Sequence, residues 1–262
     1  MNRDVRLLQF TDPHLFEHPN GALRGVESLG SLRSVLMHAA DRLSSVDAVL
    51  CTGDVVNDEA GGYVHFAREF AALGKPVYCV PGNHDDAALM RRALSKPPFQ
   101  VGGYVDLGAW RLVLVDSSVA GQAGGRISRH ELRALDSALS GTDRYAMICL
   151  HHHPVGMASN WLDAVGVENA DEFFEVLDAH PRVRLVSWGH VHQCFDGRRR
   201  GVRLVATPST GGQFVPLADK FAIDARPPAY RRLTLQSDGS IDTDVIWVEA
   251  GAGILTSASA SG

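Results

Sequence analysis

The chain has 262 residues, of which 45% are hydrophobic and 21% are charged, and its formal net charge is −5. This composition is that of a globular protein of one large α/β domain, and the acidic charge argues against a nucleic-acid scaffold because no broad basic surface is implied. No apolar run is long enough to cross a membrane, and the apolar stretch near the N-terminus is too short for a signal peptide.

The first part of the chain alternates short apolar runs with segments of helical periodicity. The apolar runs predict buried strands, and apolar residues recurring every three or four positions predict amphipathic helices. The predicted strands are Val5–Thr11, Val46–Thr52 and Pro76–Val80. The predicted helices between and after them are Val26–Leu43, Tyr63–Leu73 and Ala87–Leu94.

The middle of the chain begins with a predicted hairpin and then returns to alternation. Gly108 separates the apolar runs Tyr104–Leu107 and Trp110–Asp116, which is a hairpin signal. Ser128 is a helix N-cap candidate because Glu131 follows three residues later, so a helix is expected to run to about Leu139. Further on, the pattern predicts the strand Tyr145–Leu150, the helix Asp171–Ala179 and the strand Val183–Trp188.

After His192 the pattern predicts strands only: Arg203–Thr207, Tyr230–Leu235 and Ile241–Val248. The short basic run Arg198–Arg200 is interpreted as a solvated hairpin turn because glycines flank it. We expect residues 1–250 to form one domain and residues 251–262 to form a flexible tail. The predicted architecture is a four-layer αββα sandwich, in which helices flank two mixed β-sheets.

The four cysteines are scattered, and Cys51, Cys79 and Cys149 lie within predicted strands. We therefore expect buried free thiols rather than disulfides or a zinc cluster. Free thiols are typical of a reducing compartment, so the sequence predicts a cytoplasmic protein.

Polar residues able to bind metal ions follow five of the predicted strands. They are Asp12, His14, Asp54, Asn83, His152, His190 and His192. Carboxylates and imidazoles are ligands of first-row metals, and the ends of strands are where α/β folds place their chemistry. On an extended chain, Asp12 and His14 would point the same way and bind one ion, and His190 and His192 would repeat this arrangement. The Asp54 carboxylate has two oxygens and could bridge two ions.

Each of these motifs alone has an ordinary structural explanation. Asp-x-His triplets are common, Gly-Asp is usually a turn, and "GNHD" could serve only as capping and turn chemistry. The run His151–His153 could be a packed cluster. The combination is more specific, because every motif follows a predicted strand in a defined order.

That order, DxH, GD, GNH[DE], HxP and GHxH, resembles the calcineurin-like metallophosphoesterase superfamily over nearly the whole chain. More narrowly, "TDPHLF", "LHHHPV", "NWLDAVGVEN" and "GHVHQ" followed by "ATPST" and "QF" are similar to bacterial class III 3′,5′-cyclic-AMP phosphodiesterases.

The resemblance implies two metal sites that share one aspartate. The first would use Asp12, His14, Asp54 and His192, and the second Asp54, Asn83, His152 and His190. His152 is preferred to His151 and His153 because the family's ligand stands two residues before a proline, here Pro154. His151 would be buried support, and His153 could face the site or solvent. His84 would be the catalytic leaving-group histidine and Asp85 the carboxylate that orients it. His14, Asp54, Asn83, His84 and His192 would contribute to cofactor binding.

The implied reaction is hydrolysis of 3′,5′-cyclic AMP to 5′-AMP by a hydroxide that bridges two ions about 3.5–4 Å apart. Fe or Mn would suit the nitrogen and oxygen ligands, with Zn or Co as alternatives. Other outcomes are a broad phosphodiesterase of glycerophosphodiesters or 2′,3′-cyclic nucleotides, a phosphatase or nuclease, and a scaffold without activity. Relatives are often dimers, so the resemblance also implies a homodimer.

The substrate is less clearly indicated than the reaction. The loops that carry the ligands place no arginine beside a ligand, which favours a diester over a monoester unless Arg24 or Arg126 folds back. Phe16 and Trp161 lie in the longest irregular segments and could stack on a base. The alternative is that Trp161 only packs within its own loop.

Overall fold

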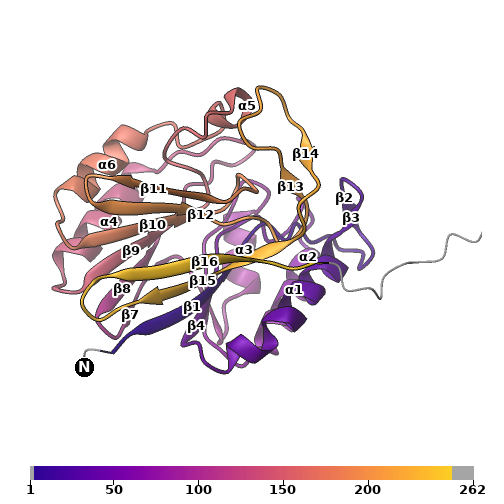
Figure 1. Ribbon diagram of the computed structural model, residues 1–262, viewed down its shortest axis with the longest axis horizontal. Coiled ribbons are helices and arrows are strands. Elements are labelled where there is room, and N and C mark those ends of the chain that lie inside the picture. Colours follow the sequence, from indigo (N-terminus) through magenta and orange to yellow (C-terminus); the bar gives the residue numbers. More distant parts are fainter. Residues whose placement is uncertain (1–2, 250–262) are drawn as a thin grey trace, which may run out of the picture.

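Two six-stranded β-sheets form the centre of the protein, shown in Figure 1 as a computed structural model that describes residues 3–249. The first sheet has the order β16 (Ile241–Trp247), β15 (Ala229–Leu235), β1 (Val5–Phe10), β4 (Ala48–Cys51), β5 (Val77–Cys79) and β6 (Phe99–Val101). The second has the order β11 (Phe195–Arg199), β12 (Val202–Ala206), β10 (Val183–Trp188), β9 (Tyr145–Cys149), β8 (Trp110–Leu114) and β7 (Gly103–Leu107). The predicted tail, 251–262, lies outside the described residues.

Both sheets combine central parallel strands with antiparallel strands toward their edges. Strands β1, β4, β5 and β6 are parallel, as are β8, β9, β10 and β12. Strands β15 and β16 in one sheet and β7 and β11 in the other add antiparallel pairs. Because the parallel strands of a sheet share one direction, the loops that follow them emerge at the same edge.

Helices cover the outer face of each sheet, so the predicted four-layer sandwich is confirmed. The helices are α1 (Ser28–Leu43), α2 (Gly62–Ala71), α3 (Ala87–Ala93), α4 (Arg129–Ser140), α5 (Asn160–Asp163) and α6 (Ala170–Asp178). Figure 1 shows α1 and α2 beside the first sheet and α4 and α6 beside the second. An apolar cluster, which includes Leu7, Leu50, Met147 and Leu185, fills the space between the sheets. Burial of these side chains holds the two halves together.

Local signals in the sequence predicted several elements correctly. The Ser128 side chain accepts a hydrogen bond from the Glu131 amide at the start of α4, and Gly108 has a φ of +51° in the β7–β8 turn. Helix α1 begins later than expected, because Val26 and Glu27 form β3, which pairs with β2 (Ala22–Leu23). The edge strand β6, the short helix α5 and the hairpin of β13 (Gln213–Phe214) with β14 (Ile223–Asp224) were not predicted. These elements are too short for a periodic pattern.

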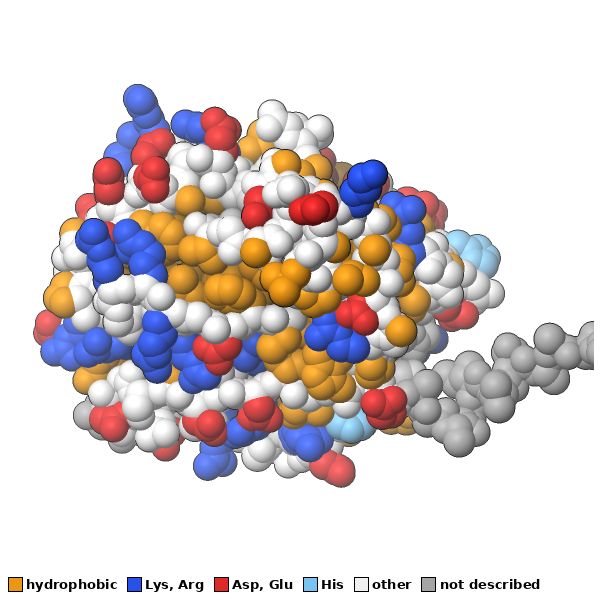
Figure 2. All heavy atoms as spheres, turned by 45° about the horizontal axis from the view of Figure 1, so that its top comes forward, with side chains coloured by type: hydrophobic (Ala, Val, Ile, Leu, Met, Phe, Trp, Pro, Cys, Tyr) orange, Lys and Arg blue, Asp and Glu red, His pale blue; other side chains and the backbone are white. Residues whose placement is uncertain are grey.

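Several charged side chains form ion pairs at the surface. The basic run lies in the β11–β12 hairpin, and both Arg199 and Arg200 contact Asp178. Figure 2 shows Lys and Arg side chains interspersed with Asp and Glu on the face that it draws. Among residues 3–249, no helix combines the length and the apolar character needed to span a membrane.

Candidate metal centre

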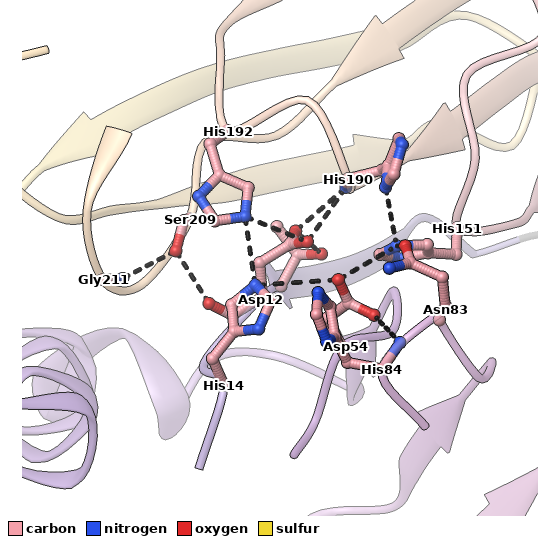
Figure 3. Close-up of polar contacts among 12 residues, drawn as sticks. Asp12, His14, Asp54, Asn83, His84, His151, His190, His192, Ser209 and Gly211 are labelled. Carbon is pink, nitrogen blue, oxygen red and sulfur yellow. Dashed lines mark hydrogen bonds and ion pairs between the residues drawn. The ribbon is translucent and has the colours of Figure 1, made fainter. Parts of the chain in front are cut away.

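The loops after five parallel strands bring the predicted polar residues together in one buried cluster. Asp12 and His14 follow β1, Asp54 follows β4, and Asn83 follows β5. The other predicted histidines, His152, His190 and His192, come from the second sheet, in the loops after β9 and β10. Figure 3 shows these side chains pointing toward one another from both sheets. The prediction that the cluster forms at strand ends is therefore confirmed.

One group of side chains consists of Asp12, His14 and His192. The Nε2 atoms of His14 and His192 are 3.2 Å apart, and His192 Nε2 is 3.4 Å from Asp12 Oδ1. All three side chains are buried. One donor atom from each residue falls within 4.8 Å of the others, so the group could hold a metal ion.

A second group contains His151, His152 and His190, and one donor atom from each lies within 4.8 Å of the others. His151 Nε2 lies 3.2 Å from Asn83 Oδ1 and 3.2 Å from His190 Nδ1. His152 instead places Nδ1 2.8 Å from the Ser117 hydroxyl, although its ring is also close to His190. Within residues 3–249, His152 Nε2 is buried without a hydrogen-bond partner, so the choice of His152 made from the sequence stays a prediction beside His151.

The Asp54 carboxylate lies between the two groups. Its Oδ2 atom is 3.6 Å from His14 Nε2 and 3.4 Å from His151 Nε2. Its Oδ1 atom accepts a hydrogen bond of 2.9 Å from the His84 backbone amide, which orients the carboxylate. A single oxygen thus faces a histidine of each group, as expected of a bridging ligand.

The backbone at these residues is not extended, which corrects the expected basis of the paired motifs. Asp12 and His14 have φ values of +52° and +46°, and His190 and His192 have values of +64° and +47°. Asp54 also has a positive φ, of +48°. Non-glycine residues seldom adopt this region, although Asp and His do so more often than most, and such strain is typical of functional sites. The side chains converge through tight left-handed turns, not through strand alternation.

Two glycines allow the backbone to approach the cluster. Gly53 has a φ of +94°, which confirms the predicted tight turn before Asp54. At Gly189, a Cβ atom would stand 2.6 Å from Asp12 Oδ2 and would also clash with Thr11. The chain after β10 can therefore reach Asp12 only with glycine at this position.

Residues from the loop after β12 support the first group, and the sequence analysis did not assign them a role. His192 Nδ1 lies 2.7 Å from the Gly212 carbonyl oxygen, and the Phe214 ring stacks on His192 with centroids 4.1 Å apart. Ser209 donates a hydrogen bond of 2.7 Å to the Asp12 carbonyl oxygen. These contacts fix the ring that would bind an ion, as is common around metal ligands. The only sequence signal was the similarity of "ATPST" and "QF" to the cyclic-AMP phosphodiesterases.

Burial and mutual contacts set the charges of the cluster. Burial lowers the pKa of His14 to about 4, and it holds the pKa of His190 well below its usual value. Burial alone would raise the pKa of Asp54, but His151 and then His14 outweigh it and hold the pKa well below the usual value. The histidines His14 and His190 are therefore neutral at pH 7 and carry a free lone pair.

The donors present fit bound metal ions. Within residues 3–249, His14 Nδ1 and His190 Nε2 are buried without a hydrogen-bond partner. Two pairs of ring nitrogens also face each other at 3.2 Å, one between His14 and His192 and one between His190 and His151. Each pair can share only one hydrogen. Buried polar groups normally have partners, and a metal ion would satisfy neutral imidazoles and carboxylates of this kind.

His84 lies at the edge of the cluster, and its carboxylate partner is Asp58 rather than the predicted Asp85. His84 Nδ1 is 2.9 Å from Asp58 Oδ2. Burial lowers the pKa of His84, but Asp54 and the Asp58 hydrogen bond outweigh it and raise the pKa. Asp85 points inward and accepts hydrogen bonds from the Gly82 and Val55 amides, so it shapes the loop. Although Asp85 and His84 are adjacent in sequence, their side chains lie on different sides of the turn.

Aromatic residues near the cluster pack on one another. Trp161 contacts Phe214 and Phe221 edge-on, with centroids 5.4 and 5.2 Å apart, so it packs beyond its own loop. The Arg24 guanidinium lies over the Phe221 ring at 4.9 Å, whereas Arg126 pairs with Glu168 at the surface.

Comparison with known proteins agrees with this geometry. The chain is 37% identical over 244 residues to a protein named 3′,5′-cyclic adenosine monophosphate phosphodiesterase CpdA from Haemophilus influenzae, covering 92% of this chain and 89% of the relative. It is 38% identical over 250 residues to the protein of the same name from Pseudomonas aeruginosa, covering 94% and 90%. A Nostoc protein named 3′,5′-cyclic-nucleotide phosphodiesterase is 32% identical over 243 residues, covering 92% and 91%.

Solved structures share the fold at low sequence identity. A dimetal phosphatase from Danio rerio superposes with a TM-score of 0.64 at 15% identity, covering 93% of this chain and 99% of that one. The family model described as calcineurin-like phosphoesterase matches residues 5–194. The matched region contains both groups of the candidate metal centre, and the chain belongs to the calcineurin-like phosphoesterase family.

Proposed function

We propose that the protein hydrolyses 3′,5′-cyclic AMP to 5′-AMP with the help of two bound metal ions. The observation that carries the proposal is the position of Asp54 Oδ2 between a histidine of each group. The names and extensive coverage of the bacterial relatives support the choice of substrate. Fe and Mn are the metals that the donor set favours.

The residues that would hold the ions divide into two sets that share Asp54. Asp12, His14 and His192 would complete the first set, and Asn83, His151 and His190 the second. When bound, two ions in such a centre supply an activated water as nucleophile and neutralise charge on the phosphate oxygens. The tight turns and the surrounding hydrogen bonds hold the side chains in place before an ion or a substrate binds.

His84 would assist departure of the leaving group. Asp58 engages Nδ1, which leaves Nε2 as the nitrogen available to the substrate. The raised pKa of His84, to which Asp54 and Asp58 contribute against the effect of burial, favours the imidazolium form, in which Nε2 carries a proton. As water attacks phosphorus and the bond to the 3′ oxygen breaks, that proton would pass to the departing oxygen, giving 5′-AMP.

A substrate panel with added Mn²⁺ tests the proposal. It comprises cyclic AMP, 2′,3′-cyclic AMP, a glycerophosphodiester and bis(4-nitrophenyl) phosphate. We expect cyclic AMP to give the highest kcat/KM and Asn83→Ala to abolish turnover of every diester. Comparable rates on all four compounds would favour a broad phosphodiesterase. Fewer than about one metal ion per chain, without rescue by Mn²⁺, would favour a non-catalytic scaffold. A homodimer, a single domain over 1–250 and a cytoplasmic location stay predictions.

A further inference from the structure

Two hollows of very different size flank the candidate metal centre. One is a cavity of about 630 Å³ beside Asn83 and His84. The other is a slot of about 20 Å³ beside His14 and His192. Binding sites for small molecules usually measure about 300–1,000 Å³, whereas 20 Å³ suffices for about one water molecule. Of these two hollows, therefore, only the one beside His84 has room for a nucleoside.

The position of His84 points to the same hollow. A group that protonates the departing oxygen must lie on the side of the phosphate from which that oxygen leaves. His84 lines the large cavity, together with Asp58 and with Ser118 and Ala120 from the loop after β8. The 3′ oxygen of the ribose would therefore face this cavity when its bond to phosphorus breaks, while the 5′ oxygen keeps the nucleoside attached to phosphorus.

We propose that the large cavity binds the nucleoside part of the substrate and that its charge excludes substituents carrying a second negative charge. This inference rests on the proposed function, because it assigns a place to the substrate of the same centre. The expected substrates are diesters whose single negative charge lies at the metal centre and whose remaining groups are neutral.

The charges around the cavity carry the second part of the proposal. Four carboxylates line it: Asp58, Asp85, Asp86 and Asp116. Two cationic groups also line it, and both are paired. The Arg91 guanidinium is held 2.7 Å from Asp116 Oδ2, and the His84 imidazolium 2.9 Å from Asp58 Oδ2.

Carboxylate oxygens accept hydrogen bonds, so the cavity suits ribose hydroxyls and amino groups of a base. A second phosphate would face several carboxylates without an unpaired cation among the lining residues.

A pair of bulky substitutions tests the location. Ala120→Trp adds an indole at an exposed position of the large cavity, and Ile223→Trp adds one at the narrow slot. We expect Ala120→Trp to raise the KM for cyclic AMP at least tenfold and Ile223→Trp to change it less than twofold. The reverse order would overturn the proposal. Should the protein cleave bis(4-nitrophenyl) phosphate but not cyclic AMP, the proposed substrate fails, and the KM for the aryl diester in both variants still tests the cavity.

A matched pair of substrates tests the charge. The 2′-O-succinyl and 2′-O-butyryl esters of cyclic AMP have similar size, but only the succinyl ester carries a carboxylate. We expect the unmodified protein to prefer the butyryl ester roughly fivefold in kcat/KM, the size of one screened contact between like charges. Equal kcat/KM for the two esters, with cyclic AMP still cleaved, would refute the charge selectivity and leave the proposed function intact.

Two variants assign the effect to named residues. Asp116→Asn keeps the Oδ1 acceptor used by the Ser118 amide and removes the ion pair with Arg91. We expect the preference for the butyryl ester to fall toward one in this variant. It should return toward fivefold in Asp116→Asn/Arg91→Gln, which removes the freed cation. An unchanged ratio in both variants would contradict the role given to Arg91.

Discussion

Replacing Asp58 by Asn should slow cyclic AMP hydrolysis while sparing substrates with good leaving groups. Asp58 has a φ of +61°, which Asn also tolerates, and its backbone amide contact with the His84 carbonyl oxygen does not involve the side chain. The substitution therefore removes mainly the charge on the 2.9 Å contact with His84 Nδ1.

The size of the effect follows from the exposure of this pair. A hydrogen bond to a charged group contributes about 1.5–3 kcal/mol when shielded from water. The Asp58 side chain is 66% exposed and that of His84 is 34% exposed, so solvent screening reduces the contribution to about 1 kcal/mol. A loss of about 1 kcal/mol of transition-state stabilisation corresponds to roughly a fivefold lower kcat/KM.

The assay compares cyclic AMP, which releases a poorly stabilised alkoxide, with bis(4-nitrophenyl) phosphate, which releases a stable phenolate. We expect the fivefold loss with cyclic AMP and less than about twofold with the aryl diester, at unchanged metal content. Asp86→Asn is the matched control, because Asp86 lines the same cavity but caps α3 through the Ala88 and Leu89 amides. Equal losses on both substrates, or the same loss in the control, would refute the role of Asp58.

Three further predictions concern the metal centre itself. His151→Ala should lower the affinity for the second ion at least tenfold and His152→Ala much less, as measured by metal titration. A larger loss for His152→Ala would refute this and support His152, the ligand predicted from the sequence. Gly189→Ala should weaken metal binding and destabilise the fold by about 1–3 kcal/mol, because the added Cβ would press on Asp12. In the control variant Gly211→Ala, the added Cβ has ordinary contacts, so both metal binding and thermal unfolding should stay unchanged. Removal of bound metal by a chelator should lower the Tm by roughly 5–10 °C relative to protein with metal at about 100 times its Kd, and an unchanged Tm would show that the cluster does not bind ions in the folded state.

The sequence alone was sufficient to predict the sandwich and the gathering of the site at strand ends. Buried strands such as β4 and β9 are continuous apolar runs, and a polar residue directly after such a run must lie at the edge of a sheet. The order of strands and polar residues along the chain carries this information, because parallel strands deliver their following loops to a common edge. The N-cap at Ser128 and the turn at Gly53 were predictable for local steric and hydrogen-bonding reasons.

Directions of side chains within the loops were decided only by the tertiary structure. The left-handed turns at Asp12 and His190, the contact of His151 with Asn83 and the contact of Asp58 with His84 depend on segments that are distant in sequence. A periodic pattern defines which face a residue takes in a strand or a helix, but it stops where the regular backbone stops. Beyond that point, packing against other loops determines each φ and ψ, so residues adjacent in sequence can point to opposite sides of the site.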